Sequence, residues 1–319
     1  MAREVDAVYM KQLDGVRGIA ILLVLLAHYR FMPGYGFLGV RLFFVLSGFL
    51  ITSILLRDGS LLSFYARRAL RIFPAYYVVV LFGVLLGDPR VLQNLPFVLT
   101  YTGNISELMG GGIGPGHFWS LYVEEQFYLF WPTILLLIPR QRLILSIVCM
   151  MTLSIAFRAK MWQAGFVEES QHLPFGCLDT LGAGALLAVC RRDGVKIPGL
   201  WLGPLVFAVV WYWPPLQGGW YAYADTAAAW ASLWLVAGAS AGFKGTAAAI
   251  LSNPALCYVG RISYGLYLYH LFFIPWHPIA GIAMTFALGI LSFHFYETPL
   301  NNLKDRFPYT NRGGVPTAA

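Results

Sequence analysis

Long runs of apolar residues recur along the chain from Ile19 to Phe295, and they set the strongest limit on its fold. A helix needs about 20 mostly apolar residues to cross a lipid bilayer. Of the 319 residues, 58% are hydrophobic and only 12% are charged, whereas an average soluble domain carries about 25% charged residues. The sequence therefore predicts an all-α integral membrane protein.

The apolar runs divide into about ten candidate transmembrane spans. The segment 90–104 is too short and polar to be counted among them, and it is interpreted as re-entrant or interfacial. Residues 1–310 are expected to form one transmembrane domain, and residues 311–319 a short, disordered cytoplasmic tail. The predicted spans are 15–32, 37–56, 74–87, 118–138, 143–159, 175–190, 198–214, 226–243, 257–275 and 278–297.

The positions of the basic residues orient these spans, because cytoplasmic loops carry an excess of Lys and Arg. If the N-terminus is cytoplasmic, both termini are cytoplasmic and most of the 22 Lys and Arg residues lie on that side. The net charge of +7 then comes from short loops rather than from a basic patch, so nucleic acid is not an expected partner. The basic residues left on the outer side are Arg30, Arg41, Arg90, Arg158 and Lys160.

Arg17 and His28 stand at the two ends of the first predicted span, eleven residues apart. In an α-helix this separation places them about 20° from the same face and about 16.5 Å apart along the axis. Both side chains could simply reach the two membrane interfaces. Ionisable residues inside a membrane also mark functional paths, which makes His28 a candidate catalytic residue.

The segment "FWSLYVEEQFYLFWP" opens the fourth predicted span and carries two adjacent carboxylates. Ser120 and Glu124 share one helix face, because they are four residues apart. A carboxylate at the start of an apolar helix is costly unless it is paired or hydrated. Glu124 is therefore a candidate partner for a histidine, whereas Glu125 is interpreted as a solvated charge near a helix N-terminus.

Two other segments carry candidate site residues. In "SFYARRALRIFPAYY", assigned to a cytoplasmic loop, the arginines could contact anionic lipid or bind phosphate groups. In "RISYGLYLYHL", three polar residues share one helix face and belong either to an aromatic belt or to a polar lining. The residues concerned are Arg67, Arg68 and Arg71 in the first segment, and Ser263, Tyr267 and His270 in the second, while His117, His172, His277 and His294 receive no role.

Five segments in the order "LDGVRGIAILLVLLAH", "FFVLSGFLI", "FYARRALRIFP", "FWSLYVEEQFYLFWP" and "ISYGLYLYH" together resemble the membrane acyltransferase-3 family. The resemblance covers nearly the whole chain. It implies a multi-span membrane domain that moves an acyl group, often acetyl, from cytoplasmic acyl-CoA to a sugar or related acceptor.

The motifs of that family match this chain residue by residue at several positions. One departure is that some members carry an arginine near the position of Cys177. The four cysteines form no C-x-x-C pair and are expected to be small buried residues, and no metal site is expected. The matching positions are Arg17 and His28 in the first motif, Ser47 and Gly48 in the second, Arg68 and Arg71 in the third and Glu124 in the fourth.

The resemblance predicts an O-acetyltransferase of a bacterial inner membrane, with acyl-CoA as co-substrate and no tightly bound cofactor. Its acceptor would be a polysaccharide, a lipid-linked saccharide or a glycoside, and its oligomeric state is left open. His28 would act on the acceptor hydroxyl as general base and Glu124 would orient its imidazole, although an acyl-histidine intermediate is an alternative. Acyl-CoA is expected to contact Arg17, Arg67, Arg68 and Arg71, and the acceptor or oxyanion to contact Ser120, Tyr267 and His270.

A second class of function is compatible with the same polar helix faces. They could line a transporter or flippase for a glycolipid or saccharide that performs no acyl transfer. Transporters often show paired broken helices in two matching halves, and no such pairing is visible in the sequence. A purely structural membrane subunit would leave His28, Glu124 and the arginine cluster unexplained.

Overall fold

The computed structural model describes residues 10–57, 60–212, 221–275 and 277–309, and within these ranges it contains helices and no strand, which confirms the all-α class. The predicted tail 311–319 lies outside the described residues. The α-helices are α1 Lys11–His28, α2 Gly36–Arg57, α3 Leu61–Leu85, α4 Pro89–Leu92, α5 Leu95–Leu99, α6 Gly103–Leu108, α7 Phe118–Leu137, α8 Leu143–Gln163, α9 Val167–His172, α10 Pro174–Asp193, α11 Gly203–Tyr212, α12 Tyr221–Ala241, α13 Gly245–Leu251, α14 Pro254–Arg261, α15 Ser263–Tyr269, α16 Pro278–Ser292 and α17 Thr298–Asn301.

Fewer helices than predicted are long and apolar enough to cross a membrane. Among the described residues four pass by length and composition: Gly36–Arg57, Leu61–Leu85, Arg140–Gln163 and Pro278–Arg306. The pair α12 and α13, bent by 92°, gives a fifth if it is one span. The count of about ten spans is therefore not confirmed, because α1 and α7 carry several ionisable residues and α11, α14 and α15 are short.

The arginine-rich segment is a helix and not the cytoplasmic loop that the sequence predicted. It forms the N-terminal part of α3, which begins at Leu61 and continues through Pro74 to Leu85. Ser60 caps the helix, since its hydroxyl accepts a hydrogen bond from the Ser63 amide at 3.3 Å. Arginine has a high helix propensity, so charge alone did not mark the end of the helix.

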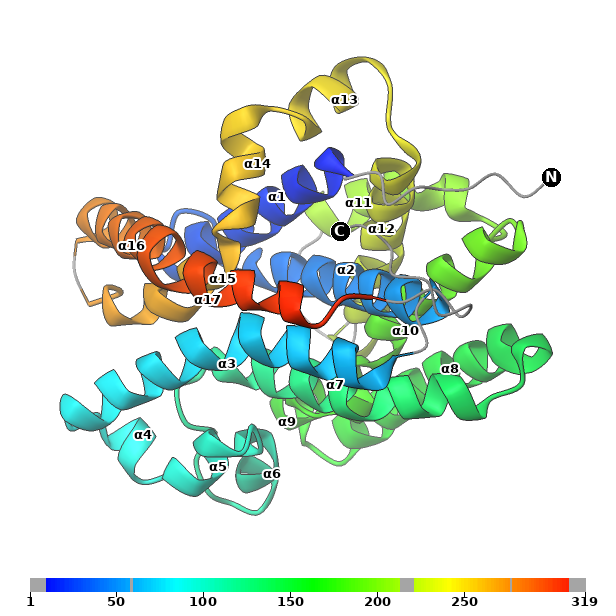
Figure 1. Cartoon of the computed structure of the whole chain (residues 1–319). Helices are drawn as coiled ribbons and strands as arrows, with labels where there is room; N and C mark the ends of the chain where they lie inside the picture. Colours follow the sequence, from blue (N-terminus) through cyan, green and yellow to red (C-terminus); the bar gives the residue numbers. More distant parts are fainter. Residues whose placement is uncertain (1–9, 58–59, 213–220, 276, 310–319) are drawn as a thin grey trace.

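The segment 90–104 does not form a spanning helix. It lies within a run of short helices, α4, α5 and α6, of four, five and six residues. A proline stands in the first turn of α4 and another in the first turn of α5, where the missing amide proton is tolerated. In Figure 1 these helices form a separate group beside the C-terminal end of α3.

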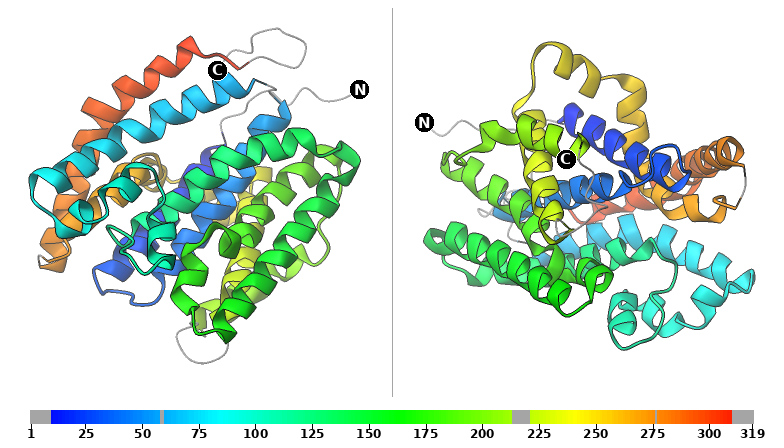
Figure 2. Two further views of the ribbon diagram at one scale, coloured as in Figure 1. Left: turned by 90° about the horizontal axis from the view of Figure 1, so that it is seen from below. Right: turned by 180° about the vertical axis from the view of Figure 1, so that it is seen from behind.

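The central helices α1 and α2 pack on each other, with α13 and α14 on one side and α3 and α7 on the other (Figure 1). Helices α2 and α10 approach at glycines: a Cβ on Gly48 would lie 1.9 Å from the Leu181 carbonyl oxygen, and one on Gly184 would lie 2.0 Å from the Val45 oxygen. Small residues permit such backbone contact between membrane helices. Figure 2 shows the C-terminal segment, in red, running alongside α3.

Candidate active site

A first cavity of about 90 Å³, here called the inner cavity, lies among α1, α2, α3, α7 and α15. Helix α1 supplies Arg17, and one face of α3 supplies Arg68 and Arg71, because these two residues are one helical turn apart. The other lining residues are Val40, Phe43, Phe44, Leu46, Ser47, Ile72, Ser120, Leu121, Glu124, Glu125, Tyr128, Ser263, Tyr264 and Tyr267.

The inner cavity holds more positive than negative side chains, with three arginines and two glutamates on its wall. Glu124 interacts electrostatically with all three arginines, and its Oε1 accepts a hydrogen bond of 2.6 Å from the Ser47 hydroxyl. The Tyr128 hydroxyl donates to Ser47 at 2.8 Å, and the guanidinium of Arg68 lies 5.0 Å from the Tyr128 ring centre. Fixed guanidinium groups of this kind are suited to binding phosphates.

Arg67 lies outside this cavity, although its neighbour Arg68 lines it. The Arg67 guanidinium donates to the carbonyl oxygens of Lys304 and Phe307, each at 3.1 Å, and lies 4.3 Å from the ring centre of Tyr309. Arg67 therefore attaches the C-terminal segment to α3. The structure gives no support to its predicted contact with acyl-CoA.

A second cavity of about 360 Å³, here called the outer cavity, lies at the other end of α1. Val40 lines both cavities, and the consecutive residues Trp119 and Ser120 of α7 line the outer and the inner one respectively. The two cavities therefore adjoin across Val40. The outer cavity is lined by Ala27, His28, Gly34, Gly36, Phe37, Val40, Trp119, Gln171, His172, Ala224 and Asp225.

The protonation of His28 is set by the backbone of its own helix. Its Nδ1 lies 2.9 Å from the carbonyl oxygen of Val24. A carbonyl oxygen can only accept, so Nδ1 carries the proton and Nε2 is left as a free base. The structure does not bring Glu124 and His28 together as predicted: the two line different cavities, and no contact joins them in the part of the chain that the structure describes.

Two buried histidines, His270 and His117, continue from His28 as a series of ring contacts. The ring of His270 is fully buried, with its centre 4.8 Å from that of His28 and 4.9 Å from that of His117. The Nδ1 of His270 lies 2.7 Å from the Tyr267 carbonyl oxygen. Among the described residues no three His, Cys, Asp or Glu side chains are arranged to hold a metal ion. His117 received no role from the sequence, although it directly precedes the motif that opens α7.

The structure brings Ser120 and Tyr267 together at the inner cavity, whereas His270, whose ring centre is 5.6 Å from that of Tyr267, lines neither cavity. The Ser120 and Tyr267 hydroxyls are 2.5 Å apart on the wall of the inner cavity, and the Tyr267 hydroxyl also donates to the His117 carbonyl oxygen at 2.8 Å. His270 is beside His28, where it supports the imidazole ring by packing against it. Ser263 and Tyr267 therefore line the inner cavity, whereas His270 packs on His28, so the three residues of the predicted common face do not meet at one site.

Comparison with known proteins places the chain in a family. A model described as acyltransferase domain matches residues 10–302. A Staphylococcus aureus protein named as a putative O-acetyltransferase is 30% identical over 91% of this chain and 57% of its own length. Peptidoglycan O-acetyltransferase OatA of Listeria monocytogenes is 29% identical over 92% of this chain and 56% of its own length.

The chain thus spans a little over half the length of the curated relatives it matches. No solved structure matches it. The family model covers nearly all the described residues, including the helices that form both cavities. Four helical segments of the described residues, α2 and α3 among them, are long and apolar enough to cross a membrane. The chain is a multi-pass helical membrane protein and belongs to the acyltransferase domain family.

Proposed function

We propose that this protein is a membrane-bound O-acyltransferase that moves an acetyl group from acetyl-CoA to a hydroxyl of a sugar-containing acceptor. The observation that carries the proposal is the pair of adjoining cavities, with arginines on the wall of one and the free Nε2 of His28 on the wall of the other. Relatives named as O-acetyltransferases, one of them for peptidoglycan, support this reaction and make a cell-wall glycan a suitable acceptor.

The inner cavity is the proposed site for the donor. The phosphates of acetyl-CoA would bind to Arg17, Arg68 and Arg71, since guanidinium groups bind phosphate oxygens in pairs. The thioester would then extend toward Val40, the residue shared by the two cavities. Glu124, held by Ser47 and facing the same arginines, positions the cationic side chains and does not act on the acceptor.

The reaction would take place where the cavities adjoin. His28 Nε2 removes the proton from the acceptor hydroxyl, and the hydroxyl oxygen attacks the thioester carbonyl carbon. The carbon–sulfur bond breaks, the electron pair leaves with the CoA sulfur, and that sulfur takes up a proton to form the free thiol. Direct transfer and transfer through acyl-His28 both use the same nitrogen and give the same products.

We propose the membrane topology that places most Lys and Arg residues on the cytoplasmic side, as the positive-inside rule requires. The inner cavity faces the cytoplasm, where acetyl-CoA is made, and His28 faces the outer side of a bacterial inner membrane. Helices that are too short or too polar to cross a bilayer alone would complete about ten spans by packing on their neighbours. Both chain ends would then be cytoplasmic.

The proposal is tested against a transporter by measuring thioester loss without a membrane gradient. Purified protein in detergent, given acetyl-CoA and a glycan fraction from its source membranes, is expected to release free CoA thiol and add one acetyl mass to the glycan. An acyltransferase needs no gradient for this reaction. An intact thioester with every such fraction, together with glycan movement in reconstituted vesicles, would contradict the proposal and favour the transporter.

A further inference from the structure

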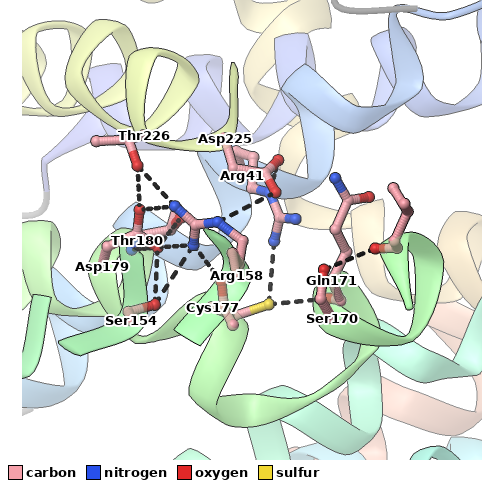
Figure 3. A network of polar contacts seen from close by, with 12 residues as sticks. Arg41, Ser154, Arg158, Ser170, Gln171, Cys177, Asp179, Thr180, Asp225 and Thr226 are labelled. Atoms are coloured by element: carbon pink, nitrogen blue, oxygen red, sulfur yellow. Dashed lines mark hydrogen bonds and ion pairs between the residues drawn. The ribbon is translucent and has the colours of Figure 1, made fainter. Parts of the chain in front are cut away.

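A buried network of ion pairs (Figure 3) reaches the outer cavity at one residue, Asp225. Arg41 Nε donates to Asp225 Oδ1 at 2.7 Å, and Arg158 Nη2 donates to Asp179 Oδ2 at 2.6 Å. Thr226 also donates to Asp179 Oδ2, at 2.7 Å. These arginines and aspartates are almost completely buried, so each charge depends on its neighbours in the network.

Asp179 and Asp225 differ in how many of their carboxylate oxygens accept a hydrogen bond. Both carboxylate oxygens of Asp179 accept hydrogen bonds from Arg158. Asp225 Oδ2 has no hydrogen-bond partner among the described residues, and its nearest cation is the Arg158 Nε at 3.9 Å. Asp225 lines the outer cavity together with His28, whereas Asp179 does not. An ionised carboxylate can only accept hydrogen bonds, so the buried Oδ2 of Asp225 needs a donor that the described residues do not supply.

An aromatic ring lies on the same cavity wall. Trp119 and His172 have ring centres 4.9 Å apart, and His172 Nδ1 is held 2.8 Å from Glu107 Oε2. The guanidinium of Arg41 lies 5.6 Å from the Trp119 ring, so the tryptophan is supported by the same ion-pair network. A rigid aromatic face next to fixed polar groups is suited to a pyranose ring, which presents C–H bonds on its face and hydroxyls at its edge.

We infer that the outer cavity is a sugar subsite in which Trp119 packs against the face of the acceptor pyranose and Asp225 accepts a hydrogen bond from one of its donor groups. This inference rests on the proposed function and deepens it. Because His28 occupies the same cavity at a fixed place, the orientation of the ring decides which hydroxyl meets Nε2. Asp225 and Trp119 are therefore specificity-determining residues that select the hydroxyl to be acylated.

Sugar binding is measured first without acetyl-CoA, so that it does not depend on acyl transfer. The probes are chitotetraose and cellotetraose, which have the same β-1,4 linkage. They differ at C2 of each sugar ring, where the hydrogen-bond donor is an acetamido group in the first and a hydroxyl group in the second. We expect at least one of them to bind the purified wild-type protein. Asp225→Asn should weaken that binding about tenfold or more, as for loss of a hydrogen bond to a charged group. Trp119→Ala should weaken it to a similar degree, because the sugar loses its aromatic contact.

Asp179→Asn is the matched control, because it disturbs the same network without touching the outer cavity. It should weaken sugar binding much less than Asp225→Asn does, and Trp119→Ala provides the test if Asp225→Asn does not fold. With acetyl-CoA added, the Asp225 and Trp119 variants should also shift the position of the acetyl group on the sugar. Equal loss of binding in the Asp179 and Asp225 variants, or no binding of either probe by the wild type, would overturn the inference. Sugar binding without any thioester loss would instead count against the proposed function alone.

Discussion

Replacing His28 with glutamine is expected to lower acetyl transfer by about 10²–10⁴-fold, the usual contribution of a positioned general base. Glutamine keeps the polarity and approximate size of the side chain, but it cannot take up a proton. Its amide can still donate to the Val24 carbonyl, so the end of α1 should remain folded. The rate of acetyl transfer to the glycan, measured at saturating acetyl-CoA with purified protein, checks this result.

His294→Gln is the control for this substitution. His294 is exposed, and its Nε2 lies 3.0 Å from the Tyr258 hydroxyl, on neither cavity wall. Its replacement should leave the transfer rate within about twofold, because surface substitutions have small effects. Transfer by stably inserted His28→Gln protein at the wild-type rate would remove His28 from the chemistry.

Replacing Arg68 or Arg71 with alanine is expected to raise the KM for acetyl-CoA by about 10- to 100-fold, which corresponds to about 1.5–3 kcal/mol for a hydrogen bond to a charged group. Both side chains line the inner cavity beside Glu124, where the phosphates of the donor are proposed to bind. The KM for the sugar should change little, because the acceptor is proposed to bind in the outer cavity. Initial rates at varied acetyl-CoA separate the two constants.

Arg67→Ala supplies a control one residue away. Arg67 has the same charge as Arg68 and lies on the same helix, but it contacts the backbone of Lys304 and Phe307. Its replacement should lower stability without raising the KM for acetyl-CoA. An equal rise of this KM in all three arginine variants would contradict the account. It would mean that acetyl-CoA is attracted by the positive charge of the whole cluster and does not depend on the inner cavity.

Helical periodicity was enough to predict two of the polar residue pairs that line the inner cavity. The one-turn spacing of Arg68 and Arg71 and the four-residue spacing of Ser120 and Glu124 each put two side chains on one face, and the structure brings both pairs to the same cavity. The sequence could not show that Arg67 points elsewhere. Its position depends on the C-terminal segment, which packs on α3 from more than 230 residues away.

The outer cavity was much harder to predict, because it is assembled from residues far apart in the chain. Asp225 lies in the second turn of α12 and Trp119 in the first turn of α7, and neither belongs to a periodic pattern with His28. The orientation of His28 by the Val24 carbonyl was also missed, since reasoning from residue types sought a carboxylate partner. Contacts such as that between His270 and His28 depend on the break after α15, which propensities did not reveal.

The central claim is that acetyl-CoA binds from one side of the membrane and the acceptor from the other. Acetyl transfer across a closed membrane tests this claim most directly. Inside-out vesicles carrying the protein would be loaded with the acceptor glycan and given radiolabelled acetyl-CoA on the outside. We predict that the label appears on the trapped glycan and that His28→Gln abolishes it. Label found only on glycan added to the same side as acetyl-CoA would contradict transfer between the two cavities.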